Sequence, residues 1–323
     1  MDRYGRDMIQ SVVTPNEEPA DAALRDALAH GDAMLQSLAP VMRHLLTDAQ
    51  HAVFADEIVA RVRGGVSDVA CQLLDAAATA GTGQRDRVDR AALDALFAGL
   101  TNIPGFLGHV HALALEWQLT ERLQTRLALD PTLPPLLQAL LASSDPTTSA
   151  LAMNLLAAQA RFAQTQRRMQ LPLGELPADL LHGALLALRA LCGHESQAAA
   201  ADAKIRADFD ESRTRLGLIA RLVLGMGSGA IAALSLTHAG VAIFATALGA
   251  ASGQDRDAVV LSTAEGQAVR LALALRVAGL RQPAIAEQLG TLQEEHVPPI
   301  DWDHVDADRA AALLAVALPP TGA

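Results

Sequence analysis

The hydrophobic and polar positions along the chain recur with the period of a helix, not with the period of two that a half-buried strand requires. After residues 1–20, apolar residues return three or four positions apart in one segment after another, and glycine or proline separates the segments. There are about a dozen such segments, and they are joined by roughly two to eight residues, as connections between helices usually are. No run of alternating apolar and polar residues is long enough to demand a sheet. The pattern predicts an all-α protein.

Capping residues and helix breakers predict where several helices begin and end. At Asp145-Pro146 the carboxylate is suited to cap a helix, and proline suits the first helical position because its missing N–H is not needed there. This helix is expected to run to about Met169. The other predicted boundaries are a start at Thr47, an end at Gly64-Gly65, a start at Pro177, an end at Gly193 and a last helix over residues 305–318.

The order of the predicted helices indicates an irregular bundle or a degenerate helical-repeat array, because no fixed repeat period is present. Residues 1–20 are polar and carry both charge signs, which predicts a mobile tail. An N-terminal helical region is predicted over residues 21–192 and a C-terminal one over residues 204–318. The most linker-like interior stretch is residues 81–90, and a single continuous domain is the alternative to two regions.

Composition strengthens the helical prediction and narrows the function. Alanine makes up about one residue in five, whereas Phe, Trp and Tyr together number nine. The formal charge is −11, so counterion release does not favour binding to nucleic acid. Two cysteines are too few for a disulfide framework, and the polar N-terminus lacks the apolar core of a secretory signal. These observations predict a cytoplasmic protein.

Several short patterns resemble catalytic or ligand-binding motifs, but the residues around them do not fit those motifs. Residues 223–230 match the glycine pattern of a dinucleotide fold, but they follow a helix, and the next acidic residue, Asp255, comes too late to hold a ribose. The acidic run 301–308 lacks the glycine and glutamate of a calcium loop, and His109 and His111 point to nearly opposite sides of a helix. We therefore predict no catalytic residue, no cofactor and no metal, and a protein that is not an enzyme.

Two stretches support alternative functions. Residues 222–254 contain no charged side chain, so a membrane-associated protein inserting residues 222–251 is one alternative, although glycines interrupt the stretch and a buried hairpin is favoured. Residues 282–297 resemble the first half of a helix-turn-helix, which would make the protein a DNA-binding regulator. Between Arg281 and His304 there are five acids and one arginine, which disfavours contact with phosphates.

Polar residues gather at the end of the helix that follows Pro146, and they form the best candidate site. Arg161, Gln164 and Arg168 share one helical face, because they are spaced three or four residues apart. An arginine-rich surface suits a carboxylate or acidic partner, since guanidinium groups bind carboxylates in pairs of hydrogen bonds. The predicted partner-binding residues are Arg161, Gln164, Arg167, Arg168 and Glu175, the last as an internal counter-ion. The leading hypothesis is a non-enzymatic helical protein that binds another protein, with a solvated helix end as the alternative reading of these residues.

Two phrases of the sequence carry a resemblance. The residues from Asp130 through QARFAQTQRRMQLPLGELPADLLHGALLAL, together with ASGQDRDAVVLSTAEGQAVRLALALRVAGL, resemble a group of uncharacterised α-helical proteins of alphaproteobacteria. The resemblance covers about residues 130–190 and 250–280. It implies an α-helical, cytoplasmic, bacterial protein and assigns no catalytic residue.

Overall fold

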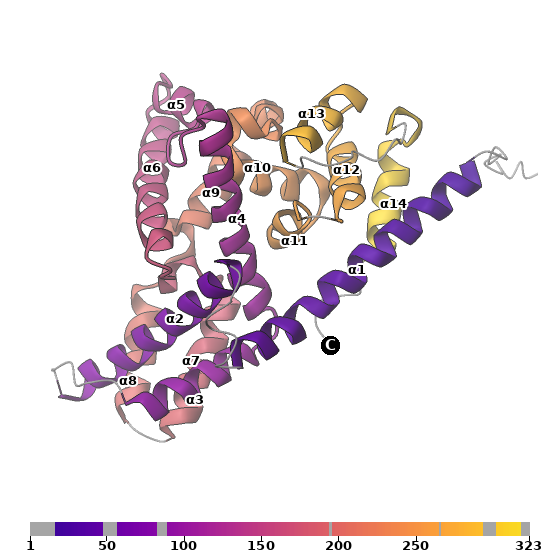
Figure 1. Cartoon of the computed structure of the whole chain (residues 1–323). Helices are drawn as coiled ribbons and strands as arrows, with labels where there is room; N and C mark the ends of the chain where they lie inside the picture. Colours follow the sequence, from indigo (N-terminus) through magenta and orange to yellow (C-terminus); the bar gives the residue numbers. More distant parts are fainter. Residues whose placement is uncertain are drawn as a thin grey trace, which may run out of the picture.

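The computed structural model describes residues 17–47, 57–82, 89–193, 196–264, 266–292 and 302–317. In these ranges the chain forms α-helices and short 3-10 helices and no strand, which confirms the all-α prediction (Figure 1). The described elements are α1 Glu17–Thr47, α2 Glu57–Thr82, α3 Arg90–Thr101, α4 Phe106–Leu127, α5 Pro135–Leu141, α6 Pro146–Arg167, η2 Leu173–Glu175, α7 Ala178–Cys192, α8 Ser196–Asp208, η3 Glu211–Arg213, α9 Arg215–Gly225, η4 Gly227–Leu234, α10 Leu236–Ser252, α11 Arg256–Leu261, α12 Ala268–Val277, α13 Gln282–Leu292, η5 Trp302–His304 and α14 Ala307–Ala317.

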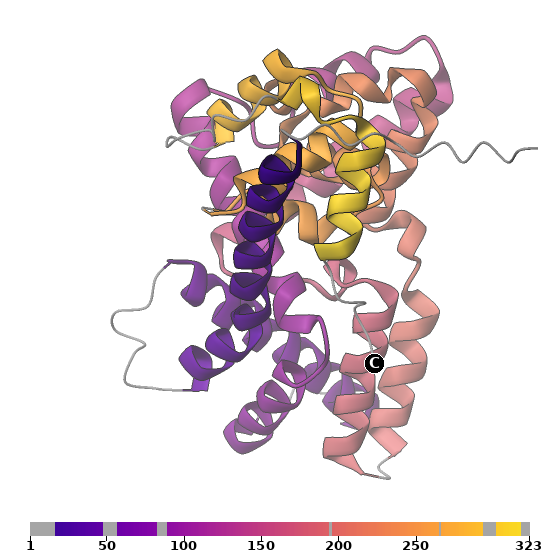
Figure 2. The same cartoon turned by 90° about the vertical axis from the view of Figure 1, so that its right-hand side faces the viewer.

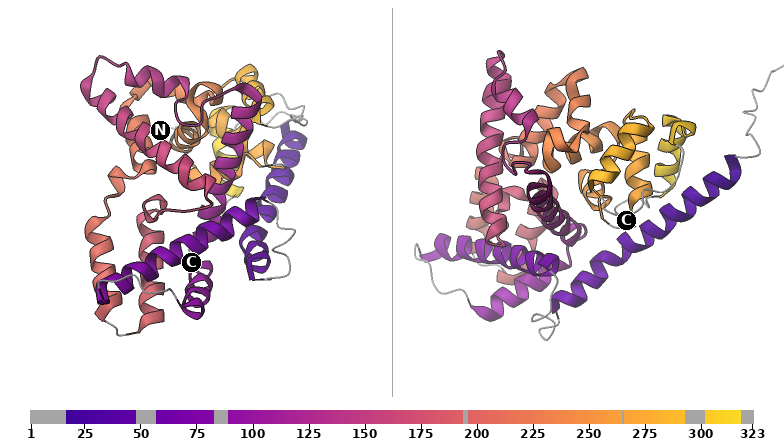
Figure 3. Two further views of the ribbon diagram at one scale, coloured as in Figure 1. Left: turned by 60° about the vertical axis from the view of Figure 1, so that its left-hand side comes forward. Right: turned by 45° about the horizontal axis from the view of Figure 1, so that its top comes forward.

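Helix α1 runs along one side of the molecule and contacts helices that are distant in the sequence. In three views it passes the C-terminal helices α12 and α14 before it reaches α4 and α2 (Figures 1, 2 and 3). Asp32 of α1 forms an ion pair with Arg270 of α12, and the Gly31 carbonyl accepts a hydrogen bond from Gln267 at 2.9 Å. Residues 17–20, which were expected in the tail, belong to this helix, and residues 1–16 lie outside the described residues.

Helix α4 lies at the centre of the bundle. It packs against α2, α6, α10 and α11, so it contacts helices of both predicted regions. Helix α6 packs against α9 across the predicted boundary at residues 193–203. One contiguous apolar core extends through these helices, and Trp117 and Phe106 of α4 are among its fully buried side chains.

Several predicted boundaries agree with the structure. Asp145 caps α6 by accepting hydrogen bonds from the amides of Thr147 and Thr148, and the helix ends at Arg167. Helix α7 begins directly after Pro177 and ends before Gly193, whose φ of 61° lies in the left-handed region. The last helix begins at Ala307, close to the predicted residue 305.

The predicted helix end at Gly64-Gly65 is wrong. Helix α2 continues through both glycines to Thr82. A Cβ atom on Gly64 would lie 2.6 Å from the Met169 carbonyl oxygen, and one on Gly65 would lie 3.3 Å from Val110. The two glycines therefore permit close packing of α2 instead of ending the helix. The predicted start at Thr47 falls on the last residue of α1, and residues 48–56 lie outside the described residues.

The uncharged stretch 222–254 is divided among the end of α9, η4 and α10. The chain bends by 118° between α9 and η4, and most of α10 is buried. Leu224 and Ile231 on the first two elements are 74% and 66% exposed. Among the described residues no single helix has the length and apolar character to cross a bilayer. Two bent pairs of helices, α3 with α4 and α9 with η4, have that length and composition only when both helices of the pair are counted.

Candidate functional site

A cluster of charged side chains lies inside the molecule where α4, α6, η2, α9 and α11 meet. We call Glu116, Glu175, Arg215 and Arg256 the ionic cluster. Glu116 comes from the middle of α4, Glu175 from η2, and the two arginines are the first residues of α9 and α11. Burying charges is costly unless each one is paired and hydrogen-bonded, so the pairing decides what this cluster can do.

Arg215 is the centre of the ionic cluster and is only 2% exposed. Its Nη1 donates to Glu116 Oε1 at 2.7 Å and to Gln159 Oε1 at 3.1 Å, and its Nε donates to Glu175 Oε2 at 2.8 Å. The guanidinium carbon lies 3.6 Å from the centroid of the Phe162 ring, a cation–π contact. The hydrogen bonds of this guanidinium are therefore directed into the protein, and one of its faces lies on the Phe162 ring.

Glu116 accepts hydrogen bonds from two arginines, Arg215 and Arg256. Burial by itself would raise the pKa of this carboxyl group, but the two guanidinium groups outweigh burial and lower the pKa to about 2. Glu116 is therefore ionised throughout the physiological range. Arg256 also donates to Thr246 Oγ1 at 3.3 Å, so the cluster extends to α10.

His109 lies about two turns before Glu116 on the same face of α4. Both of its ring nitrogens contact acceptors. Nδ1 is 2.6 Å from Asp257 Oδ2, and Nε2 is 2.9 Å from the Glu175 carbonyl oxygen. Only the protonated imidazole can donate from both nitrogens. Burial opposes this charge, but Asp257 and the two hydrogen bonds outweigh burial and raise the pKa of His109. The ring has no free nitrogen for proton transfer or for a metal.

Two pockets lie on either side of the segment Asp208–Gly217, which connects α8 to α9. The arginine pocket, of about 550 Å³, is lined by Arg161, Phe162, Gln164, Phe209 and Arg213 together with neighbouring residues. The aspartate pocket, of about 670 Å³, is lined by the His109–Asp257 pair, Asp255, Arg256 and the start of α9. Both volumes are in the range of small-ligand sites.

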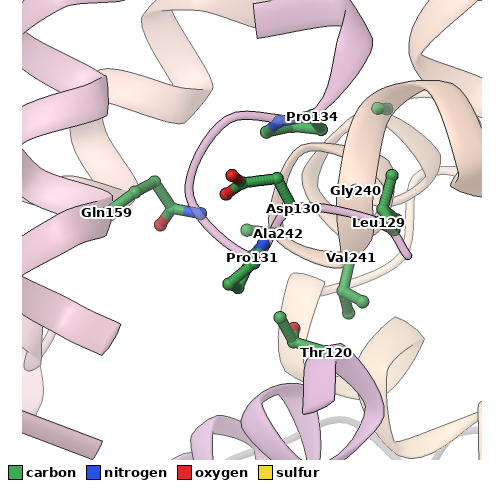
Figure 4. A pocket seen from close by; sticks show the side chains of 10 residues that line it. Thr120, Leu129, Asp130, Pro131, Pro134, Gln159, Gly240, Val241 and Ala242 are labelled. Atoms are coloured by element: carbon green, nitrogen blue, oxygen red, sulfur yellow. The ribbon is translucent and has the colours of Figure 1, made fainter. Parts of the chain in front are cut away.

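A third hollow is too small for an organic ligand. Asp130, Thr120, Pro134 and Gly240 surround a cavity of about 20 Å³, and Gln159 extends toward it from α6 (Figure 4). This volume is about that of one water-sized probe. The cavity therefore belongs to the packing around Gln159 and is not a candidate site.

The structure places the five predicted site residues in three environments. Arg161, Gln164 and Glu175 line the arginine pocket. The Arg167 guanidinium lies 5.9 Å from the Trp117 ring, and Arg168 is the C-cap residue of α6. Glu175 is an internal counter-ion, as predicted, but its partner among the described residues is Arg215 and not an arginine of α6.

The ionic cluster does not follow from the local sequence. The charged run 204–215 has mixed signs at helical spacing, which predicts the solvated face of one long helix. This prediction is wrong, because α8 ends at Asp208, and Arg215 begins a new helix and is buried. The local signal was present, because Asp210 caps η3 and Thr214 caps α9 by accepting a hydrogen bond from the Gly217 amide at 3.1 Å. Two capping residues so close together are typical of a break between helices.

The other motifs that the sequence raised are accounted for by helix packing where the structure describes them. Of the helix-turn-helix alternative, residues 282–292 form α13, whose Ile285 and Leu289 are buried, while residues 293–297 lie outside the described residues. The glycine pattern at 223–230 forms the bend between α9 and η4. Within the described ranges there is no group of three or more His, Cys, Asp or Glu side chains suited to a metal ion.

Comparison with protein-family models, with curated proteins and with solved structures finds no match for this chain.

Proposed function

We propose that this chain is a non-enzymatic binding protein whose arginine pocket receives an acidic segment of a protein partner. One observation carries the proposal. Arg161 and Arg213 line the same pocket, are exposed, and make no side-chain hydrogen bond or ion pair with any described residue. Arg215, two residues from Arg213, has acceptors on Glu116, Glu175 and Gln159.

The chemistry of the pocket suits a peptide that carries both carboxylate and apolar side chains. Two free guanidinium groups can each hold a carboxylate with a pair of hydrogen bonds. Phe209, which is partly exposed, supplies apolar surface, and Gln164 adds an amide donor. Charged groups of this kind govern the rate and specificity of association more than the total affinity.

Two acidic residues on the wall of the arginine pocket affect its affinity for an acidic ligand. Asp210 is already occupied, since its carboxylate accepts hydrogen bonds from the Ser212 amide at 3.0 Å and hydroxyl at 2.7 Å. Asp208 is exposed and forms no ion pair with a described residue, so it repels an acidic ligand. Replacing Asp208 with asparagine should therefore strengthen binding of an acidic peptide.

The residues that most resemble catalytic machinery support binding over catalysis. His109 uses both ring nitrogens within the protein, and the carboxylate of Glu116 is held between two arginines. A general base needs a nitrogen or oxygen that can reach the proton of a substrate. The proposal therefore places function at the arginine pocket and stability at the ionic cluster.

A pair of double variants tests the proposal. Fluorescence anisotropy measures the Kd of a labelled peptide of alternating Glu and Phe for the wild type, for Arg161→Ala with Arg213→Ala, and for the charge-matched control Arg167→Ala with Arg168→Ala. We expect at least a ~10-fold rise in Kd for the first variant and less than a ~2-fold change for the control. A peptide with Lys in place of Glu should bind at least ~10-fold more weakly than the acidic one.

Two results would contradict the proposal: equal effects of the two double variants, or equal binding of the acidic and basic peptides. The first would show that the peptide responds to overall charge and not to the pocket. Circular dichroism of both variants checks that the helices are retained.

A further inference from the structure

The aspartate pocket combines an apolar wall with carboxylates at one end. Leu176 and Pro177 directly precede α7, and Leu216 and Ala220 come from α9. Asp255 and Asp257 flank the first residue of α11. Ligand sites are typically mostly apolar with a few convergent polar groups, and this pocket has that composition.

The charges of the pocket wall do not balance. Five carboxylates line the pocket, namely Glu175, Asp210, Glu211, Asp255 and Asp257, against three cationic side chains, His109, Arg221 and Arg256. Glu175 is neutralised from behind by Arg215. One carboxylate therefore exceeds the cations that face it. A cation from outside the protein would restore neutrality.

Asp255 is the unmatched carboxylate of this wall, because it stands at the N-cap position of α11 without a side-chain capping hydrogen bond and forms no ion pair with any described residue. Asp210 and Glu211 also lack ion pairs among the described residues, but they accept hydrogen bonds from the amides of Ser212 and Ala178. The cations near it are engaged: Arg256 binds Glu116 and Thr246, and His109 donates from both nitrogens. Arg221 donates to the Ser212 carbonyl oxygen at 3.3 Å. The wall thus offers a carboxylate that has no ion pair with a described residue, beside cations that are already engaged.

We propose that the aspartate pocket binds a small organic monocation, with an ammonium group at Asp255 and Asp257 and an apolar body against Leu216 and Ala220. The pocket volume of about 670 Å³ admits a ligand of this kind. A partly desolvated position and the neighbouring charge of Asp257 raise the pKa of Asp255, and a bound cation relieves that repulsion. This site is separate from the arginine pocket, so it does not depend on the proposed function.

Three probes that share one apolar body test the inference. Isothermal titration calorimetry compares hexylammonium, hexanoate and 1-hexanol on the wild-type protein. We expect hexylammonium to bind at least ~10-fold more tightly than the other two, because only its head group pairs with Asp255. Equal binding of 1-hexanol would show that the pocket recognises only the apolar body. Tighter binding of hexanoate would show that the pocket prefers an anion. Either result overturns the inference.

Two variants locate the binding, and a third serves as control. Asp255→Asn removes the unmatched charge without breaking an ion pair and should weaken hexylammonium ~10-fold, whereas Ala220→Leu should weaken it by filling the pocket. Asp208→Asn makes the same charge change in the other pocket and should leave the Kd within ~2-fold. An unchanged Kd in Asp255→Asn overturns the inference. Binding that survives Arg161→Ala with Arg213→Ala shows that the two sites act independently.

Discussion

The arginine pocket and the aspartate pocket share the segment Asp208–Gly217 as a wall, yet they present opposite charges. On one side Arg161 and Arg213 are free. On the other side Asp255 forms no ion pair with a described residue, and the neighbouring cations are engaged. The wall contains both signs of charge, so its composition does not explain the difference. The difference comes from which charges are paired inside the molecule.

Arg215 is the residue that keeps the charges of the two pockets different. Its side chain turns inward from the shared wall and neutralises both Glu116 and Glu175. Without this inward cation, Glu175 would add its charge to both pockets, since it lines each of them. A buried, closed set of ion pairs can therefore fix the charge that two separate surfaces present to solvent.

The largest expected effect comes from breaking the ionic cluster. In Glu116→Gln the side chain keeps its shape but loses the charge that holds Arg215 and Arg256. Leaving buried charges without a counter-charge costs about 3–5 kcal/mol of unfolding free energy. Urea unfolding followed by circular dichroism measures it, with the exposed Glu211→Gln as a control that should change stability by less than about 0.5 kcal/mol. A loss of less than about 1 kcal/mol in Glu116→Gln would contradict the view that the Glu116 charge stabilises the ionic cluster.

The acid profile of the same variant gives a second readout. The pKa of Glu116 falls from 4.5 to about 2 on folding, so its contribution to stability is complete above pH 4.5 and is lost as the pH falls toward 2. The stability of the wild type should therefore decline over this interval more steeply than that of Glu116→Gln. Parallel pH profiles for the two proteins would contradict the assignment of the low pKa to Glu116.

The next effect concerns the wall itself. Gly217 packs directly against the backbone of Glu211 and Ser212, where an added Cβ atom would collide with the Glu211 carbonyl oxygen. Gly217→Ala should therefore displace η3 and cost about 1–3 kcal/mol. Gly108 in α4 has open space at the same position, so Gly108→Ala should be neutral or stabilising by up to about 1 kcal/mol. Thermal unfolding of both variants makes the comparison, and equal changes would contradict the steric argument.

A smaller effect tests the charge state at the edge of the aspartate pocket. Asp257 and the Glu175 carbonyl raise the pKa of His109 above 6.5. Its contribution to stability is therefore complete below pH 6.5 and is lost as the pH rises through the higher pKa of the folded state. The melting temperature of the wild type should fall relative to that of His109→Gln as the pH is raised from 6 to 9. A constant difference across this range would show that His109 does not change its charge there.

The smallest effect concerns the unmatched carboxylate. Asp255 has a raised pKa, which means that its ionised form is disfavoured by folding, most strongly at neutral pH. Asp255→Asn should therefore raise the melting temperature at pH 7 by about 1 °C and leave it unchanged at pH 3. Differential scanning fluorimetry measures both values. A drop at pH 7 would show that Asp255 stabilises the protein and is not free to bind a ligand.

Much of the fold follows from local sequence. The helical period, the cap at Asp145 and the glycine at Gly193 each act over a few residues, so the chain determines them without distant contacts. Gly64-Gly65 marks where this local reading fails. A pair of glycines ends a helix in isolation, but here the packing of Met169 and Val110 against α2 is what requires them.

The candidate sites depend on contacts that no local pattern contains. The sequence singled out Arg161 and Gln164 because they share a helical face, but Arg213 joins them from a segment some fifty residues later. Glu116 and Arg215 are 99 residues apart, and nothing near either residue identifies the other as its partner. Capping and periodicity are short-range interactions, so the local sequence is enough to make the chain helical and to place several helix ends. Which charges are buried in pairs and which stay unpaired is set only in the folded chain, because that pairing depends on the desolvation of side chains brought together from separate helices.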